Sequence, residues 1–295
     1  MEPQTKRLIL FLVLPSLLLA LLINAYYVRP LPDYKMHVHF YDVGQGDSTF
    51  IQTFMGNQIL IDGGPDNSLL PELAADMPFF DKQIELIIVS HPHADHVGGL
   101  DAVLKKYRVK EIVMPDDEFS SPPYDEFLRL IRQNQIKVTY AHEGQRIYLD
   151  QSTVFDVYYP PAGHFLLNNS YDGLATNKRN PNDVSIVGML VFGRTKFLFS
   201  GDAGQGIEDV ILPKYNLDAD VLKVGHHGSK YSSSAEFLAE VTPSFSVIEV
   251  GKNSYGHPAP EALDRLKNIN TTILRTDLNH EVRFSSDGYT VTLDK

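Results

Sequence analysis

Short apolar runs alternate with polar turns along most of the chain, and this pattern predicts a mixed fold of strands and helices. Turn residues such as Met55-Gly56-Asn57 bound several of the runs, as is typical of short buried strands. The predicted strands span 36–41, 49–54, 58–61, 84–89, 109–114, 137–140, 185–191, 196–199, 221–224, 245–250, 272–275, 281–284 and 289–293.

Amphipathic segments between these strands predict helices at 98–107, 124–134, 203–212, 234–240 and 260–267. Many short buried strands with helices between them indicate an α/β fold in which sheet packs on sheet and helices cover both faces. No long linker, low-complexity stretch or repeat interrupts residues 33–295, so we expect one domain there.

The N-terminus has a different pattern. Lys6 and Arg7 precede an uncharged apolar run over 8–23, as in export signals. A bilayer span needs about 20 apolar residues, which this run reaches only if 25–28 are added. Residues 1–32 are therefore expected to be a signal peptide or a membrane anchor with a short linker, an uncleaved anchor being slightly favoured. The positive-inside rule then leaves the domain extracytoplasmic, either membrane-anchored or secreted.

Charge and cysteine content narrow the chemistry. The chain has 37 acidic and 26 basic residues, a net charge of −11, which disfavours a broad electrostatic grip on nucleic acid or anionic lipid. It contains no Cys, so thiolate nucleophiles, thiolate metal sites and disulfides are excluded. Histidine and carboxylate side chains are the remaining strong metal ligands.

The densest group of such side chains follows the predicted strand 84–89. His91, His93, Asp95 and His96 lie within six residues, immediately before Gly98-Gly99. Side chains alternate in extended chain, so His91 and His93 point the same way and can share one metal. Asp95 and His96, past the turn, can reach a second metal.

Two further strand ends carry ligand-type residues. Asp202 follows strand 196–199, where a carboxylate can bridge two metals, because α/β sites gather at the carboxyl ends of strands. His226 and His227 follow strand 221–224, and adjacent side chains diverge in extended chain. We expect His226 to bind metal and His227 to contact substrate or orient a ligand.

Weaker features surround these positions. Asp62, in an Asp-Gly-Gly turn, can accept a hydrogen bond from a ligand imidazole, and Asn182 opens a strand before Asp202. Ser229 and His257 are candidates for phosphate hydrogen bonds. Four cations near the predicted ligands can draw a phosphodiester anion towards the site despite the net negative charge: Lys178, Arg179, Lys230 and Lys252.

These residues together resemble the metallo-β-lactamase superfamily over nearly all of residues 36–290. Three segments are further similar to the hydrolase domain of the ComEC family of competence DNA-uptake proteins: Phe40–Ser48, Lys223–Ser229 and Gly256–Pro258. The resemblance implies an αββα sandwich with a dinuclear site at one edge of the sheets. It does not extend to a channel, since the sequence contains no multi-helix membrane domain.

The resemblance also implies a ligand set and a mechanism. His91, His93 and Asp202 would hold one divalent ion, with Asp95, His96, His226 and the shared Asp202 holding the other. The ions would be zinc or manganese, and a bridging hydroxide would attack a phosphodiester with Asp95 and Asp202 as catalytic residues. Some family members carry another His before the strand that leads to the bridging Asp, where this chain has Asn182 or Asp183.

Three functions stay open from the sequence. The first is an extracytoplasmic metal-dependent phosphodiesterase or nuclease related to DNA uptake. The second is a phosphodiesterase acting on a cell-wall polymer of the teichoic-acid type. The third is a non-catalytic, metal-containing DNA-binding module. The expected partners are a phosphodiester substrate, with DNA favoured by the motifs, and the membrane through the N-terminal segment; no obligate protein partner is inferred.

Overall fold

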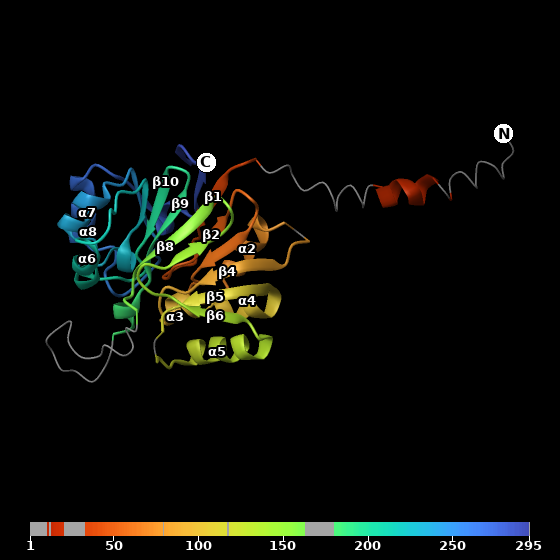
Figure 1. Cartoon of the computed structure of the whole chain (residues 1–295), viewed down its shortest axis with the longest axis horizontal. Coiled ribbons are helices and arrows are strands. Elements are labelled where there is room, and N and C mark those ends of the chain that lie inside the picture. The colour runs from red at the N-terminus through yellow and green to blue at the C-terminus, as the bar shows by residue number, and fades with distance from the viewer. Residues whose placement is uncertain are drawn as a thin grey trace.

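Two β-sheets face each other, and helices cover their outer faces (Figure 1). The computed structural model describes residues 11, 13–20, 33–78, 80–116, 118–162 and 180–294. This architecture confirms the predicted αββα sandwich. Within the described ranges, no helix is both long and apolar enough to cross a membrane. Most of the predicted leader, 1–10 and 21–32, lies outside the described residues.

The first sheet has the strand order β15-β14-β1-β2-β3-β4-β5-β6. Helices α2 (Leu69–Asp76), α4 (Leu100–Lys106) and α5 (Pro122–Asn134) cover it, and the short α3 (Ala94–Val97) precedes α4. Its strands are β15 (Val291–Leu293), β14 (Val282–Ser286), β1 (Met36–Phe40), β2 (Thr49–Gln52), β3 (Gln58–Ile61), β4 (Gln83–Ile88), β5 (Arg108–Met114) and β6 (Lys137–Tyr140).

The second sheet has the order β13-β12-β11-β10-β9-β8-β7. Helices α6 (Gln205–Ile211), α7 (Ala235–Val241) and α8 (Pro260–Asn268) pack outside it, while α9 (Thr276–Asn279) follows β13. Its strands are β13 (Thr272–Arg275), β12 (Phe245–Ile248), β11 (Val221–Lys223), β10 (Thr195–Phe199), β9 (Val187–Phe192), β8 (Thr153–Tyr159) and β7 (Arg146–Tyr148).

Most predicted elements are present with ends shifted by a few residues. The strands 58–61, 137–140 and 272–275 have the predicted bounds. The structure adds α2, α3, β7 and β8, which the sequence analysis did not assign. In β8, buried and half-buried positions alternate without a break, as expected for a strand with one face on the core.

Apolar side chains fill the space between the sheets and the two spaces beneath the helices. Phe40 of β1 and Phe199 of β10 stack across the central layer with ring centroids 5.9 Å apart. Phe284 of β14 packs edge-on against Phe197 of β10, in the other sheet, at 6.0 Å. Because aromatic pairs in these geometries add to the free energy of burial, they hold the sheets face to face.

Helix α5 shows how local sequence defines an element. Pro122 lies at its first position, where the missing N–H costs nothing, and the Ser121 side chain accepts a hydrogen bond from the Tyr124 N–H. Tyr124, Phe127 and Ile131 recur at helical spacing and are buried. This apolar stripe packs the helix against α4 and the first sheet.

Strand direction divides the molecule into two edges. Strands β1, β3, β4, β5 and β6 run parallel to one another, as do β10 to β13. We call the edge at which these strands end the carboxyl edge and the edge at which they begin the amino edge. Loops from both sheets meet at the carboxyl edge, where ligand sites of α/β proteins gather.

A cluster of charged side chains ties β1, α2 and β14 on the outer face of the first sheet. His39 Nδ1 lies 2.7 Å from Asp76 Oδ2 and 3.3 Å from Glu281 Oε1. Arg283 pairs with Glu281 at 2.6 Å, and the Tyr41 hydroxyl donates to Asp76 at 3.0 Å. Burial opposes protonation of His39, but the two carboxylates outweigh it and raise its pKa above its usual range.

This cluster makes stability depend on pH. Because the pKa of His39 is higher in the folded chain, its contribution is complete below the pKa of the unfolded chain and is lost as pH rises through the folded pKa. We expect His39→Gln to lower the free energy of unfolding by about 1–2 kcal/mol more at pH 6 than at pH 9. Denaturant titration at both pH values measures this difference. The exposed His142→Gln is the control, and an equal cost of His39→Gln at both pH values would contradict the assignment.

Candidate metal centre

The site forms where chain segments from both sheets converge at the carboxyl edge. His91 and His93 lie in the extended segment after β4, and Asp95 and His96 belong to α3. Gly98 allows this segment to pack closely, because a Cβ there would overlap the carbonyl group of Pro65. The second sheet contributes residues that follow β10 and β11.

One group of four side chains combines both sheets. Ligand atoms of Asp95, His96, Asp202 and His227 all lie within 4.8 Å of one another. Nε2 of His227 is 3.3 Å from Asp95 Oδ2 and 3.6 Å from Asp202 Oδ1, and Nε2 of His96 is 3.4 Å from Asp202 Oδ1. The three nearest approaches therefore converge on a common space bounded by nitrogen and oxygen atoms.

A second group shares Asp202 with the first. Ligand atoms of His91, His93 and Asp202 also lie within 4.8 Å of one another. His91 Nε2 is 3.1 Å from His93 Nδ1 and 3.7 Å from Asp202 Oδ2. One oxygen of Asp202 thus faces His96 and His227 while the other faces His91. The two oxygens of this carboxylate therefore face different groups of ligand atoms.

The unsatisfied atoms at the site fit metal binding. Asp202 Oδ1, His96 Nε2 and His227 Nε2 are buried and have no hydrogen-bond partner among the described residues. Buried polar atoms without partners are costly, so the convergence of these three atoms fits residues that bind a cation. Imidazole and carboxylate ligands without thiolate suit zinc, manganese or iron.

The electrostatics of the group lead to the same conclusion. Burial disfavours the charged form of His227, yet Asp202 and Asp47 outweigh it and raise the pKa of His227 to about 10. Burial also opposes protonation of His96, but Asp202, Asp47 and Asp62 together raise its pKa well above the usual range. Without a metal, protons on these two imidazoles offset the carboxylate charge. A divalent cation would displace them.

The structure places the two adjacent histidines differently from the arrangement assumed for extended chain. His227 belongs to the first ligand group, whereas His226 belongs to neither. The expectation assumed extended chain, but both residues have φ of 51° and form a tight left-handed turn. His226 Nε2 lies 3.7 Å from Asp202 Oδ2 and 3.4 Å from the Asn182 side-chain nitrogen, and its side chain is 30% exposed. His226 is thus far more exposed than His227, which is 2% exposed, and it marks the solvent-facing side of the site, which we call its opening.

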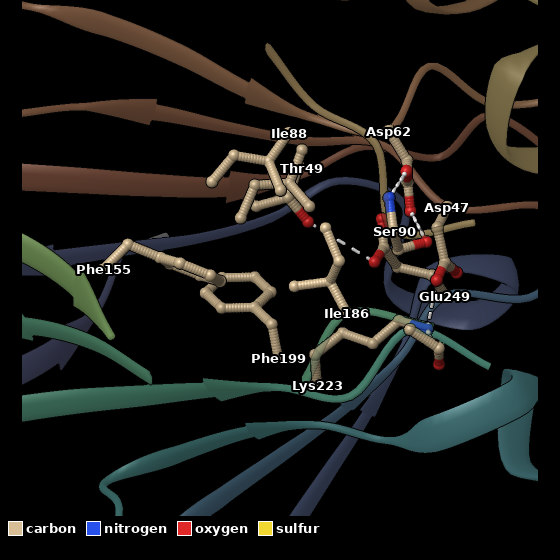
Figure 2. Close-up of a pocket in the computed structure, with 12 residues that line it drawn as sticks. Asp47, Thr49, Asp62, Ile88, Ser90, Phe155, Ile186, Phe199, Lys223 and Glu249 are labelled. Atoms are coloured by element: carbon tan, nitrogen blue, oxygen red, sulfur yellow. Dashed lines mark hydrogen bonds and ion pairs between the residues drawn. The ribbon is translucent and has the colours of Figure 1, made fainter. Parts of the chain in front are cut away.

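Asp62 orients His96, a member of the first ligand group. Its Oδ2 lies 2.8 Å from His96 Nδ1, which leaves Nε2 of that ring directed at Asp202. Its two oxygens also accept hydrogen bonds from the Ser90 N–H and hydroxyl, and the Asp62–Ser90 contacts are drawn in Figure 2. Such partners set the orientation and tautomer of a ligand imidazole.

Comparisons with known proteins agree with this geometry. A family model described as the metallo-beta-lactamase superfamily matches residues 41–248. The chain belongs to the metallo-β-lactamase superfamily.

Within the superfamily, the curated relatives are competence proteins of the ComEC family. ComE operon protein 3 of Bacillus subtilis is 28% identical over 277 residues, covering 88% of this chain and 34% of the relative. Competence protein ComA of Neisseria gonorrhoeae is 29% identical over 271 residues, covering 88% and 34%. The chain thus spans about a third of the length of these relatives. This finding confirms the resemblance stated from the motifs.

Among solved structures, the metallo-beta-lactamase fold protein YhfI from Bacillus subtilis matches with a TM-score of 0.54 at 12% identity, covering 84% of this chain and 99% of that chain. CmlA, a diiron β-hydroxylase from Streptomyces venezuelae, gives the same TM-score at 15% identity, covering 88% and 55%. At these identities the likeness establishes the fold.

Beneath the metal centre lies a buried charged network that the sequence analysis did not assign. Lys223 Nζ forms an ion pair with Asp47 Oδ2, and Asp47 Oδ1 lies 3.2 Å from His227 Nδ1. Glu249 accepts a hydrogen bond from the Ser48 N–H at 2.8 Å, and burial followed by the Asp47 charge raises the pKa of Glu249 to about 8. Asp47, Lys223 and Glu249 help to line a cavity of about 10 Å³, room for roughly one water (Figure 2).

A sequence signal for this network exists. Lys223 interrupts the apolar run of β11, and Glu249 interrupts the run that continues from β12. A charge inside a buried strand is rare unless it is paired. The partner of Glu249 could not be predicted from the sequence, because Ser48 lies 201 positions away from it.

The remaining predicted substrate contacts divide between the surface and the interior. His257 lies beside the opening, its ring 5.4 Å from that of His226. Ser229 is buried, and its hydroxyl accepts a hydrogen bond from the Tyr231 N–H, so it shapes the loop. Of the four predicted cations, Lys230 and Lys252 are exposed, while Lys178 and Arg179 lie outside the described residues.

The first test of the centre contrasts the neighbouring histidines. We expect His227→Gln to weaken metal binding at least tenfold, because it removes a buried nitrogen from the first group. His226→Gln should change the affinity by less than threefold. Titration calorimetry with zinc or manganese and the metal content after dialysis measure both variants. Equal losses of metal affinity in the two variants would show that the first ligand group is wrongly assigned.

A second test addresses the Asp47–Lys223 pair. We expect Lys223→Met to lower the free energy of unfolding by about 3–5 kcal/mol, because it leaves the buried Asp47 carboxylate uncompensated. The double variant Asp47→Asn/Lys223→Met should regain more than half of that loss. Denaturant unfolding of metal-free protein measures both variants. Additive losses in the double variant would mean that the two charges do not stabilise each other.

Proposed function

We propose that the chain is an extracytoplasmic, metal-dependent phosphodiesterase that uses two divalent ions, zinc or manganese, and acts on DNA. The observation that carries the proposal is Asp202, whose two oxygens face separate groups of ligand atoms. A pair of cations held on one carboxylate suits phosphodiester hydrolysis, since the attacking and leaving oxygens both need stabilisation.

The residues at the site divide the work. His91, His93 and Asp202 would hold one ion, and Asp95, His96, His227 and Asp202 the other. Such ions lower the pKa of water and offset the charge of phosphate oxygens. Asp95, whose side chain is about a third exposed at 32%, is available to orient the attacking water through a hydrogen bond. His226 and His257 border the opening and can donate hydrogen bonds to phosphate oxygens.

Aromatic side chains beside the opening favour a nucleic-acid substrate over a cell-wall polymer. The Tyr255 side chain is 75% exposed, and its ring lies 5.9 Å from that of His257, which in turn approaches His226. Tyr231 is also exposed, with Lys230 Nζ 5.0 Å above its ring. Exposed rings next to cations offer stacking surfaces for bases, whereas a teichoic-acid polymer has no planar base to stack.

The relatives and the N-terminal pattern support the setting. One relative is named a competence protein, and another, from Haemophilus influenzae, is named Recombination protein 2. Lys6 and Arg7 before the apolar run 8–23 favour export or anchoring with the domain outside the cytoplasm.

Turnover tests the proposal. The full chain in detergent, loaded with manganese or zinc, should hydrolyse a chromogenic phosphodiester and single-stranded DNA. Asp202→Ala should reduce both rates at least a hundredfold, because it removes the shared ligand. Failure of well-folded, two-metal protein to cleave either substrate would rule out the phosphodiesterase. One bound ion without turnover would instead favour the binding module.

A matched arm of the same assay separates DNA from other diesters. Base stacking contributes roughly 1–3 kcal/mol per base, so Tyr255→Ala should raise KM for single-stranded DNA by about fivefold or more. The KM for the chromogenic diester should change by less than twofold. Equal effects on both substrates would remove the argument for DNA and leave a smaller or wall-bound diester as substrate.

A further inference from the structure

Exposed apolar side chains gather at the amino edge, opposite the metal centre. They come from four separate loops: the segment before β1, the β2–β3 turn, the α2–β4 loop and the β14–β15 turn. Their exposed fractions range from 57% to 74%, for Tyr34, Met55, Phe80 and Tyr289. Exposed apolar side chains that stand singly are ordinary, so these four gain significance only together with the basic side chains at the same edge.

Basic side chains also lie at the amino edge. The segment from Lys105 to Lys110 contains four cations, all exposed, and lines a hollow of about 610 Å³ together with residues 134–136. Lys82 and Lys106 approach the Tyr107 ring at 5.4 and 5.7 Å. The buried Tyr107 hydroxyl has no hydrogen-bond partner in the described part of the chain.

Much of this positive charge is unpaired. Lys105 and Lys110 form ion pairs with Asp101 and Glu85. For Lys82, Lys106 and Arg108, no ion pair occurs among the residues that the structure describes. The Lys82 carbonyl accepts a hydrogen bond from the Arg108 N–H, so the starts of β4 and β5 hold these cations side by side.

The nearby carboxylates of Asp81, Asp150 and Asp287 accept hydrogen bonds from neighbouring N–H groups and, among the described residues, form no ion pair with these cations. Asp81 accepts hydrogen bonds from the Gln83 N–H and the Gln58 side chain. Asp150 and Asp287 likewise accept backbone N–H groups of their own turns. The amino edge therefore presents apolar tips and free cations on a chain whose net charge is −11.

The chain also enters the domain at this edge. Strand β1 begins at Met36, parallel to β4 and β5, so its start lies on the same side as Lys82 and Arg108. The apolar run 8–23 precedes it by only a short linker. The α2–β4 loop, which carries Phe80, projects beyond the first sheet (Figure 1).

We propose that the amino edge docks on an anionic bilayer surface. Lys82, Lys106 and Arg108 contact the lipid phosphates, while Phe80 and the other exposed apolar tips enter the interface. Aromatic rings and the stems of basic side chains favour this boundary. The metal centre then faces away from the membrane. The inference concerns orientation and does not depend on the reaction proposed above.

The absence of Trp from the chain makes a sharp test possible. Phe80→Trp places a single fluorophore at the amino edge, and Tyr140→Trp places one at the end of β6, on the carboxyl edge. Each full-length variant is bound to vesicles of phosphatidylglycerol and phosphatidylcholine whose acyl chains carry bromine. We expect at least twofold quenching for Phe80→Trp and less than 10% for Tyr140→Trp.

Charge reversal provides the second arm. In the Phe80→Trp background, Lys106→Glu/Arg108→Glu should at least halve the quenching, and the matched pair Lys214→Glu/Lys267→Glu should leave it unchanged. Replacing phosphatidylglycerol with phosphatidylcholine should likewise at least halve the quenching, as Lys106→Glu/Arg108→Glu does.

Several results would overturn the proposal. Quenching of Tyr140→Trp alone would place the opposite edge on the bilayer. No quenching at either position, with the protein bound, would mean that the N-terminal segment alone holds it. Equal effects of the two charge reversals would exclude the cations. If Lys106→Glu/Arg108→Glu instead weakens single-stranded DNA binding and leaves the quenching intact, the surface is for nucleic acid.

Discussion

The carboxylate of Asp202 is the constraint on which the carboxyl edge depends. It is 2% exposed and faces imidazoles supplied by both sheets, so its charge requires compensation from within the protein or from cations. Other charged side chains hold the surrounding imidazoles in place. Asp62 orients His96, and Asp47 with Lys223 lies beneath His227. The buried charge of Asp202 therefore affects two things: how side chains of the two sheets meet at this edge, and how strongly the site binds a metal ion.

The sequence predicted the grouping of residues that lie close together in the chain. It did not predict contacts that depend on which distant strands pair. His91, His93, Asp95 and His96 lie on one short segment, so their convergence was readable. The placement of His226 and His227 was not readable, because both lie in a left-handed turn rather than in extended chain. The partners of Lys223 and Glu249 also required knowledge of which strands meet. Strand β8 was missed even though its buried positions alternate, since polar residues such as Asp156 break its apolar run.

The two edges of the sandwich have opposite character. At the carboxyl edge buried imidazoles and carboxylates converge beneath exposed rings such as Tyr255, whereas at the amino edge the described apolar tips and cations surround no such buried group. This division follows from strand direction alone, because both sheets place the ends of their parallel strands together. One set of strand ends is therefore available for chemistry and the other for attachment, and loops can change at either edge without disturbing the core.

The pairing of β1 with β14 also governs how the domain is completed. Met36 lies opposite Ser286, so β1 acquires its second neighbour only after residues 282–286 have been made. A nascent chain that lacks residues 282–286 has an open strand edge at β1, and such edges recruit other chains. Folding of the first sheet is thereby coupled to the synthesis of β14, and truncation before residue 282 should produce aggregation rather than a smaller stable domain.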